Sequence, residues 1–224
     1  REGDRRAMTE KLEQVLPGDI EKRSFEIITQ ELGDRTFDPL EEPVIKRCIH
    51  TSADFDYVDN LVFSPGAVRK ALEAIRSGAF IVTDTNMGKA GVSKKTLASF
   101  GGEVLCFMAD PDVAEAAKRE GTTRAVASMR KAAALSRETE RPLILAVGNA
   151  PTALVEICSL MDAGELSPAL VIGVPVGFVN VVAAKELLLE RDVPSIVAKG
   201  RKGGSNIAAA ICNAILYMAR DGVK

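Results

Sequence analysis

Residues 143–152 read Leu-Ile-Leu-Ala-Val-Gly-Asn-Ala-Pro-Thr, an apolar run followed by a loop of small and polar residues. The same pattern of an apolar run, a loop and a segment with helical periodicity recurs along the chain. The other apolar runs are Leu61–Phe63, Ala79–Val82, Val104–Phe107, Ala169–Ile172 and Ser195–Val197. Buried strands that alternate with helices indicate βαβ units. The sequence therefore predicts an α/β fold with a mostly parallel sheet covered by helices on both faces.

Residues that favour helix ends mark several of the intervening helices. Pro65–Arg76 follows Ser64, which we expect to be its N-cap, and Pro111–Arg119 follows Asp110 in the same way. The last helix has one apolar face, formed by Ile207, Ile211, Ile215 and Met218. The uncharged stretches 166–184 and 203–219 contain Gly, Pro and Asn, so we expect them to be buried core segments rather than membrane spans.

The first sixty residues differ from the rest because no strand separates their helices. A helix is expected from Asp19 to Leu32, closed by Gly33, and another from about Leu40 to Ala53. We therefore expect a single domain over residues 1–224. In it, a helical preface over about 17–60 packs on a parallel-sheet core over 61–220, or on a partner.

The composition argues against nucleic acid and against a secreted protein. Apolar residues make up 46% and charged residues 27%, the net charge is -2, and aromatic residues are only 4%, so neither a basic surface nor base-stacking platforms are expected. The four cysteines are widely spaced, which favours free thiols in a reducing compartment over a zinc or disulfide framework. The charged N-terminal stretch does not resemble a signal peptide. We expect a cytoplasmic protein.

Ligands of open parallel sheets bind where the loops leave the carboxyl ends of the strands. The loops at 83–91, 148–152, 173–178 and 198–206 are rich in Gly and small polar residues, which suits anion binding by backbone N–H groups. No nucleotide-binding, P-loop, nucleophile-elbow or zinc-protease motif occurs in the chain. The stretch Arg201-Lys202-Gly203-Gly204-Ser205 before the last helix is the best anion site, unless Ser205 is a plain N-cap beside two solvated basic side chains. From these loops we expect substrate contacts by Thr85, Met87, Asn149, Arg201, Gly203 and Ser205.

His50 is the single histidine of the chain. A lone histidine is usually structural or merely exposed, but its ordinary pKa suits proton transfer near neutrality. If the local helix persists, Asp54 lies at i+4 on the same face and would favour the protonated imidazolium.

The stretch Lys46-Arg47-Cys48-Ile49-His50-Thr51-Ser52-Ala53-Asp54-Phe55-Asp56-Tyr57 resembles the signature of the precorrin-8X methylmutase family of cobalamin biosynthesis. Further segments resemble the family in the expected order, namely 20–28, 83–87, 121–124, 146–154, 175–180 and 200–206. One departure is Ala53, where the family often has Gly.

The resemblance implies a flavodoxin-like three-layer fold, usually in a homodimer. It implies an isomerase that moves a methyl group from C-11 to C-12 of precorrin-8X, or of its cobalt-loaded form, without a redox or metal cofactor. His50 matches the family's acid near the ring C nitrogen. Ser24 and Arg124 match positions near the substrate, a tetrapyrrole rich in carboxylates that Lys89 and Arg201 would also suit.

Two other functions stay open. A corrinoid-binding or corrinoid-transfer protein would use the same anion-binding loops without catalysis. A nucleotide- or sugar-phosphate-binding α/β enzyme would need a phosphate fingerprint, which the sequence lacks.

Overall fold

The computed structural model describes residues 12–223, so the charged stretch 1–11 lies outside the described residues. The chain forms two compact units, of which the first ends at Thr36 and the second begins at Phe37. The first unit contains a short 3-10 helix (Pro17–Asp19) and α2 (Ile20–Leu32). Gly33 ends α2 with a φ of 61°, which confirms the helix and the stop residue expected from the sequence.

The second unit is built around a six-stranded sheet. Its strands are β1 (Leu61–Phe63), β2 (Phe80–Thr83), β3 (Glu103–Leu105), β4 (Leu143–Val147), β5 (Leu170–Gly173) and β6 (Ser195–Ala198). All six apolar runs of the sequence thus form strands, with bounds shifted by at most two residues. Strands β2, β4, β5 and β6 are buried along their whole length, as expected for a sheet covered on both faces.

The strand order is β1-β6-β5-β4-β2-β3. Strand β1 pairs antiparallel with β6, and the other neighbours pair in parallel. When the five parallel strands are numbered in chain order, their order is 2-1-3-4-5, which is the flavodoxin-like arrangement. The chain reverses its direction of winding between β2 and β4, and the loops after these two strands form the topological switch point.

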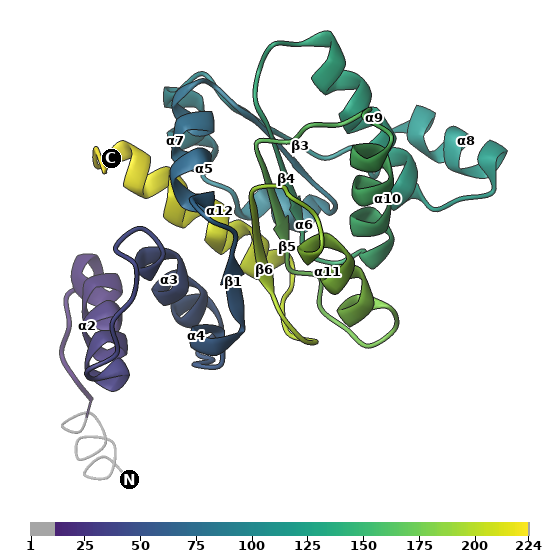
Figure 1. Cartoon of the computed structure of the whole chain (residues 1–224). Helices are drawn as coiled ribbons and strands as arrows, with labels where there is room; N and C mark the ends of the chain where they lie inside the picture. Colours follow the sequence, from purple (N-terminus) through teal and green to yellow (C-terminus); the bar gives the residue numbers. More distant parts are fainter. Residues whose placement is uncertain (1–11, 224) are drawn as a thin grey trace, which may run out of the picture. The chain divides into compact units, whose positions relative to one another are not determined.

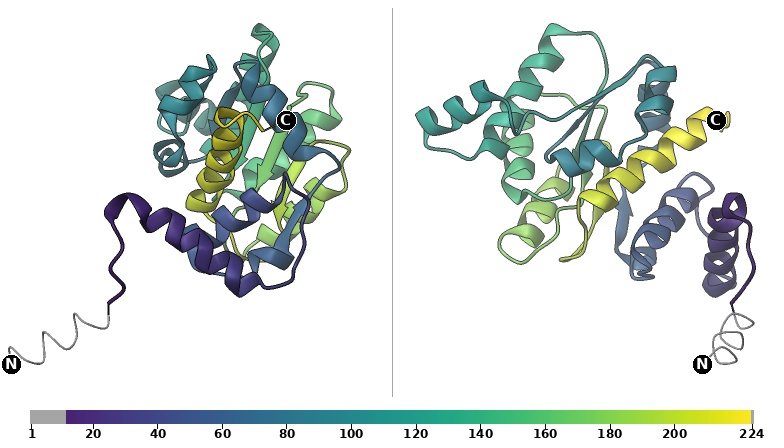
Figure 2. Two further views of the ribbon diagram at one scale, coloured as in Figure 1. Left: turned by 90° about the vertical axis from the view of Figure 1, so that its left-hand side faces the viewer. Right: turned by 180° about the vertical axis from the view of Figure 1, so that it is seen from behind.

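Helices cover both faces of this sheet. All helices of the second unit, whether or not they lie on the sheet, are α3 (Glu42–Ser52), α4 (Tyr57–Asn60), α5 (Ala67–Arg76), α6 (Asn86–Gly91), α7 (Lys94–Ser99), α8 (Pro111–Glu120), α9 (Arg124–Glu138), α10 (Pro151–Asp162), α11 (Val181–Leu189) and α12 (Ser205–Arg220). In Figure 1, α5 and α12 lie on one side of the strands and α9, α10 and α11 lie on the other. The left view of Figure 2 looks onto the α12 side, where α12 lies in front of the strands.

The core has a layer on each face of the sheet. On one face, α9, α10 and α11 pack on β2, β4 and β5 through side chains that include Met129, Leu154 and Leu188. On the other face, α12 buries the apolar stripe expected from its sequence, Ile207, Ile211, Ile215 and Met218. Within residues 12–223, no helix is both long enough and apolar enough to span a membrane. The two long uncharged stretches lie largely in the core, as predicted, but the first also contains an exposed loop with Val176, Phe178 and Val179.

One predicted helix cap is wrong, and a second lies at the predicted place but makes no side-chain hydrogen bond to its helix. Helix α5 begins at Ala67 after Gly66, and the Ser64 hydroxyl accepts a hydrogen bond from the backbone N–H of Ser195 at 2.8 Å instead. Asp110 is the N-cap residue of α8, as predicted, but its carboxylate accepts from Lys131 Nζ at 2.7 Å and not from the N–H groups of the helix. In both cases a partner far away in the sequence competes with the local backbone for the side chain. The four cysteines are free thiols, three of them buried, as expected.

Candidate functional site

Asp84 joins the two loops at the switch point. It follows β2 and is only 1% exposed. Its Oδ1 accepts from the N–H of Gly148 at 2.8 Å, and its Oδ2 accepts from the N–H groups of Asn149 and Ala150 at 2.9 and 2.7 Å. Burial raises the pKa of this carboxyl, and the three N–H donors act in the opposite direction. One buried carboxylate therefore fixes the loop after β4 against the loop after β2.

Sequence reasoning did not single out Asp84, although it lies in a loop that was expected to bind the substrate. Its distinguishing signal is a carboxylate two residues after the apolar run 79–82, across the switch point from a Gly-containing loop. A buried carboxylate at that place needs N–H donors. The neighbouring parallel strand ends at the same edge and can supply them.

Thr85 and Ser205 meet at this edge of the sheet. The Thr85 and Ser205 hydroxyl oxygens are 2.7 Å apart, and Thr85 Oγ1 also accepts from the Gly88 N–H to cap α6. A Cβ on Gly148 would lie 2.6 Å from the Ser205 Cα, so this close approach requires glycine. The loops of Thr85, Asn149 and Ser205, three predicted substrate contacts, are thus brought together. Ser205 is the first residue of α12 after Gly204, and the alternative that it is the N-cap is wrong.

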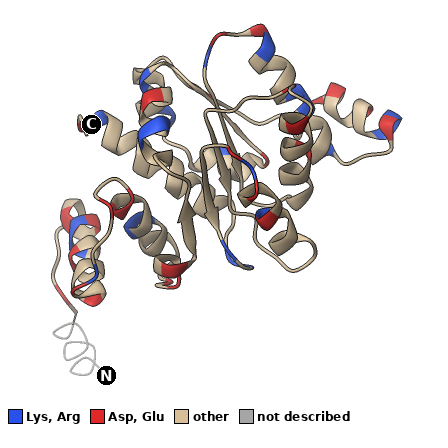
Figure 3. Ribbon diagram, in the orientation of Figure 1, with Lys and Arg blue, Asp and Glu red and all other residues tan. Residues whose placement is uncertain are grey.

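The loop after β6 is the most basic of the edge loops, and Figure 3 shows it as a blue segment between β6 and α12. The Arg201 side chain is exposed, and its guanidinium lies 5.3 Å from the centre of the Phe178 ring. In the part of the chain that the structure describes, no ion-pair partner is found for Arg201. The amide N–H groups of Arg201, Lys202 and Gly203 likewise have no hydrogen-bond acceptor among residues 12–223. An arginine beside free N–H groups is suited to a carboxylate.

Lys202 was expected to be a cation of the anion site beside Arg201, with a solvated side chain as the alternative, and the structure instead pairs it with two carboxylates. Its Nζ donates to the carboxylates of Asp54 at 2.7 Å and Asp56 at 2.5 Å. These hydrogen bonds raise the pKa of Lys202, and the bond from Lys202 lowers the pKa of Asp54. Lys202 thus ties the loop after β6 to the segment after α3. A Cβ on Gly203 would lie 2.1 Å from the carbonyl oxygen of Val174, which gives glycine a packing role there. Its contact with substrate stays a prediction.

His50 lies in the last turn of α3. This helix packs through Val44, Ile45, Cys48 and Ile49, which are all buried, and leaves His50 exposed. Ala53 then takes a left-handed conformation with a φ of 54°, so the helix does not reach Asp54. The condition for an i+4 pair between His50 and Asp54 is therefore not met. The left-handed backbone also explains why glycine suits position 53.

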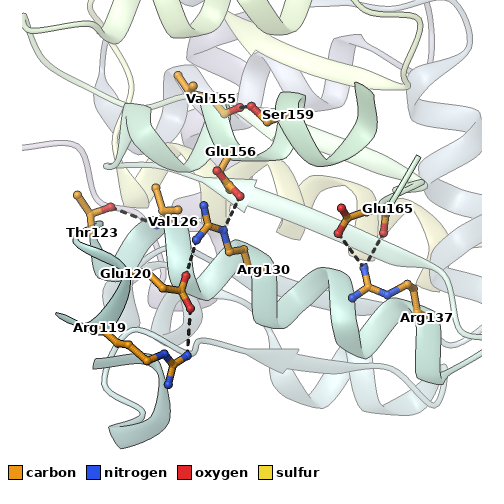
Figure 4. Close-up of polar contacts among 10 residues, drawn as sticks. All are labelled: Arg119, Glu120, Thr123, Val126, Arg130, Arg137, Val155, Glu156, Ser159 and Glu165. Carbon is orange, nitrogen blue, oxygen red and sulfur yellow. Dashed lines mark hydrogen bonds and ion pairs between the residues drawn. The ribbon is translucent and has the colours of Figure 1, made fainter. Parts of the chain in front are cut away.

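Arg124 begins α9, directly after the N-cap Thr123, whose hydroxyl accepts from the Val126 N–H at 3.2 Å. Figure 4 shows the other arginines of this region: Arg130 bridges Glu120 and Glu156, and Arg137 pairs with Glu165. Arg124 is exposed and has no carboxylate partner among the residues described. Its guanidinium is thus available to an anionic ligand.

The remaining predicted residues divide between the two units. Met87 on α6 is 72% exposed, and Phe178, in the loop after β5, is 80% exposed, so apolar side chains also line the carboxyl edge. Lys89 on α6 has no ion-pair partner in the described part of the chain. Ser24 lies on α2 of the first unit, where its hydroxyl donates to the Ile20 carbonyl at 2.9 Å. Its contact with substrate stays a prediction.

Comparison with known proteins gives a consistent picture. The family model for precorrin-8X methylmutase matches residues 19–218. A cobalt-precorrin-8 methylmutase of Priestia megaterium is 46% identical over 209 residues, which cover 93% of this chain and 91% of that protein. The cobalt-precorrin-8 methylmutase of Salmonella typhimurium is 43% identical and covers 92% and 97%. A precorrin-8X methylmutase of Pseudomonas aeruginosa is 36% identical and covers 88% and 93%.

The fold agrees with these sequence matches. A crystal structure of the precorrin-8X methyl mutase from Thermus thermophilus superposes with a TM-score of 0.81 at 44% identity, and covers 91% of this chain and 98% of that one. The chain is therefore an enzyme that belongs to the precorrin-8X methylmutase family, the methyl-shifting isomerases of cobalamin biosynthesis.

Proposed function

We propose that this enzyme moves a methyl group from C-11 to C-12 of precorrin-8X or its cobalt-loaded form, with His50 as the acid at the ring C nitrogen. The observation that carries the proposal is the double ion pair of Lys202 with Asp54 and Asp56. It ties the segment after His50 to the loop of Arg201. This ion pair thus connects the segment that carries the proposed proton donor to the loop that we propose to bind a carboxylate.

In this mechanism the His50 imidazolium protonates the ring C nitrogen or donates a strong hydrogen bond to it. The added positive charge withdraws electron density from the conjugated system and eases a 1,5-sigmatropic shift. The bond from the methyl group to C-11 breaks as the bond to C-12 forms, and the proton then returns to His50. The reaction gives hydrogenobyrinate or cobyrinate and consumes no co-reactant. General-acid assistance of this kind is typically worth about 10²–10⁴-fold in rate.

Recognition of the substrate rests on charge and on apolar surface. Arg124, Arg201 and Lys89 would bind acetate and propionate carboxylates, together with the free N–H groups of the loop after β6. Met87 and Phe178 offer exposed apolar contacts to the flat ring. Such a combination suits a macrocycle whose rim is anionic and whose face is apolar.

The cobalt-loaded form is the natural substrate in our proposal. The relatives at 46% and 43% identity are named for cobalt-precorrin-8, and the relative at 36% is named for precorrin-8X. We further propose that the two units act as one methylmutase domain over residues 1–224, because the family match spans both.

A homodimer is also part of the proposal. Leu16 and Ile20, which are 72% and 54% exposed, offer apolar surface to a second copy. Light scattering should then give twice the chain mass of 23.9 kDa, and a mass of one chain would contradict the dimer. The cytoplasmic location stays a prediction.

The test is a single-turnover reaction of the full chain with precorrin-8X, prepared with ¹³C in the migrating methyl group, with and without cobalt. The expected result is a change in absorbance together with movement of the ¹³C signal from a C-11 to a C-12 environment, faster with the cobalt-loaded form. Tight binding of both forms without any change in the ¹³C signal would contradict the proposal and favour a corrinoid carrier.

A further inference from the structure

Lys185 on α11 is the only lysine or arginine that is fully buried in the part of the chain that the structure describes, with 1% of its surface exposed. Its Nζ donates to the carbonyl oxygens of Gly200 at 2.8 Å and Lys202 at 2.9 Å. These two carbonyls flank Arg201 in the loop after β6. Nothing in the local sequence distinguishes this lysine, and the mechanism above does not use it.

The hydrogen bonds of Lys185 decide which way the loop presents its polar groups. The carbonyl between its two acceptors, that of Arg201, accepts from the Gly177 N–H at 3.0 Å. Three consecutive carbonyl oxygens, which would repel a carboxylate, are therefore bound within the protein. The N–H groups of Arg201, Lys202 and Gly203 have no acceptor among residues 12–223.

We propose that Lys185 is a positioning residue for substrate recognition, whose ammonium group holds the carbonyls of Gly200 and Lys202 and so fixes Arg201 and the neighbouring N–H groups for one carboxylate of the substrate. This inference rests on the proposed function, because that function supplies the carboxylate. Lys185 itself touches no substrate and acts through the loop.

The chemistry of the residue supports this role. The rest of α11 is mostly apolar. A Met side chain would fill the place of Lys185 without the cost of a buried ammonium group, so packing alone does not explain a lysine there. Burial disfavours the charged ammonium group and lowers the pKa of Lys185 to about 8. The two carbonyl acceptors compensate part of this cost.

The test compares Lys185→Met, which keeps the length of the side chain and removes its donors, with Lys118→Met on the exposed face of α8. Amide hydrogen exchange of the loop is measured without substrate at Lys199 and Gly204, whose N–H groups are hydrogen-bonded to the carbonyls of Asn60 and Val174. The constants kcat and KM are measured in the turnover assay. We expect Lys185→Met to speed exchange of the loop at least tenfold and to raise KM about tenfold, with kcat within twofold of the wild type. Lys118→Met should leave all three unchanged, and Lys185→Arg, which keeps the charge and the donors, should recover most of the loss in KM.

A double-mutant cycle with Arg201→Gln separates positioning from general stability. If Lys185 acts through Arg201, Lys185→Met should raise KM much less in the Arg201→Gln background than in the wild type. Equal effects in the two backgrounds, or unchanged exchange of the loop in Lys185→Met, would overturn the proposal. Failure of the wild type to turn over would refute the proposed function, whereas the exchange measurement needs no substrate and tests the loop separately.

Discussion

Asp84→Asn tests the switch point, because it keeps the size of the side chain and removes one acceptor oxygen. The carboxylate accepts three backbone N–H bonds from the loop after β4, and hydrogen bonds to charged groups contribute about 1.5–3 kcal/mol each. The Asn amide oxygen can keep one or two of them. Its NH₂ group then faces an N–H donor, and a buried donor without an acceptor costs about 1–3 kcal/mol. We expect unfolding free energy to fall by about 3 kcal/mol.

The assay is urea unfolding followed by far-ultraviolet circular dichroism. With a slope of roughly 3 kcal/mol per molar urea for a chain of this size, the midpoint should fall by about 1 M. Asp112→Asn is the matched control, because this exposed carboxylate pairs only with Lys131 at the surface and should give a much smaller shift. Equal shifts for the two variants would refute the reasoning that the buried carboxylate holds the two loops together.

Three further predictions concern other parts of the second unit. Ala53→Gly should stabilise the protein by roughly 0.5–1 kcal/mol in urea unfolding, because Ala53 has a left-handed backbone with a φ of 54°; a lower midpoint would contradict the assigned strain. Burial lowers the pKa of Lys185 to about 8, so above pH 8 the unfolded chain binds more protons at this residue than the folded chain does. The unfolding free energy of the wild type, relative to that of Lys185→Met, should therefore rise by roughly 3 kcal/mol between about pH 8 and pH ~10.4. If the unfolding free energies of the two proteins change with pH in the same way, the lowered pKa of Lys185 is contradicted. Arg124→Gln should raise KM about 10- to 100-fold and weaken its dependence on salt, because a charge-assisted bond to a carboxylate is lost. Arg119→Gln, which removes only a surface pair with Glu120, should leave KM unchanged, and equal effects of the two variants would argue against a specific site at Arg124.

The sheet could be predicted well from the sequence because its strands are continuous apolar runs. A run such as 143–147 is buried on both faces, so its composition alone marks it. The helix ends were less predictable. Ser64 has the residue type of an N-cap, but its hydroxyl bonds the N–H of Ser195, which follows 131 residues later. A local pattern does not reveal that competition.

The candidate site shows the same limit. The edge loops were predicted because parallel strands end together, and the structure does join Thr85 to Ser205 there. Asp84 and Lys185 were not predicted as site residues, because each forms hydrogen bonds with backbone groups that are distant in the sequence. Lys202 was expected to be a cation of the anion site or, in the alternative, a solvated side chain, since nothing local indicates that Asp54 and Asp56 bind it.

The most direct test of the account is a single-turnover absorbance assay of His50→Ala beside the wild type, with the cobalt-free and the cobalt-loaded substrate. The account predicts that the variant folds and binds the corrinoid, and that the spectral change to the rearranged product is lost or slowed by about 10²–10⁴-fold. Turnover by His50→Ala at the wild-type rate would contradict the assignment of His50 as the acid.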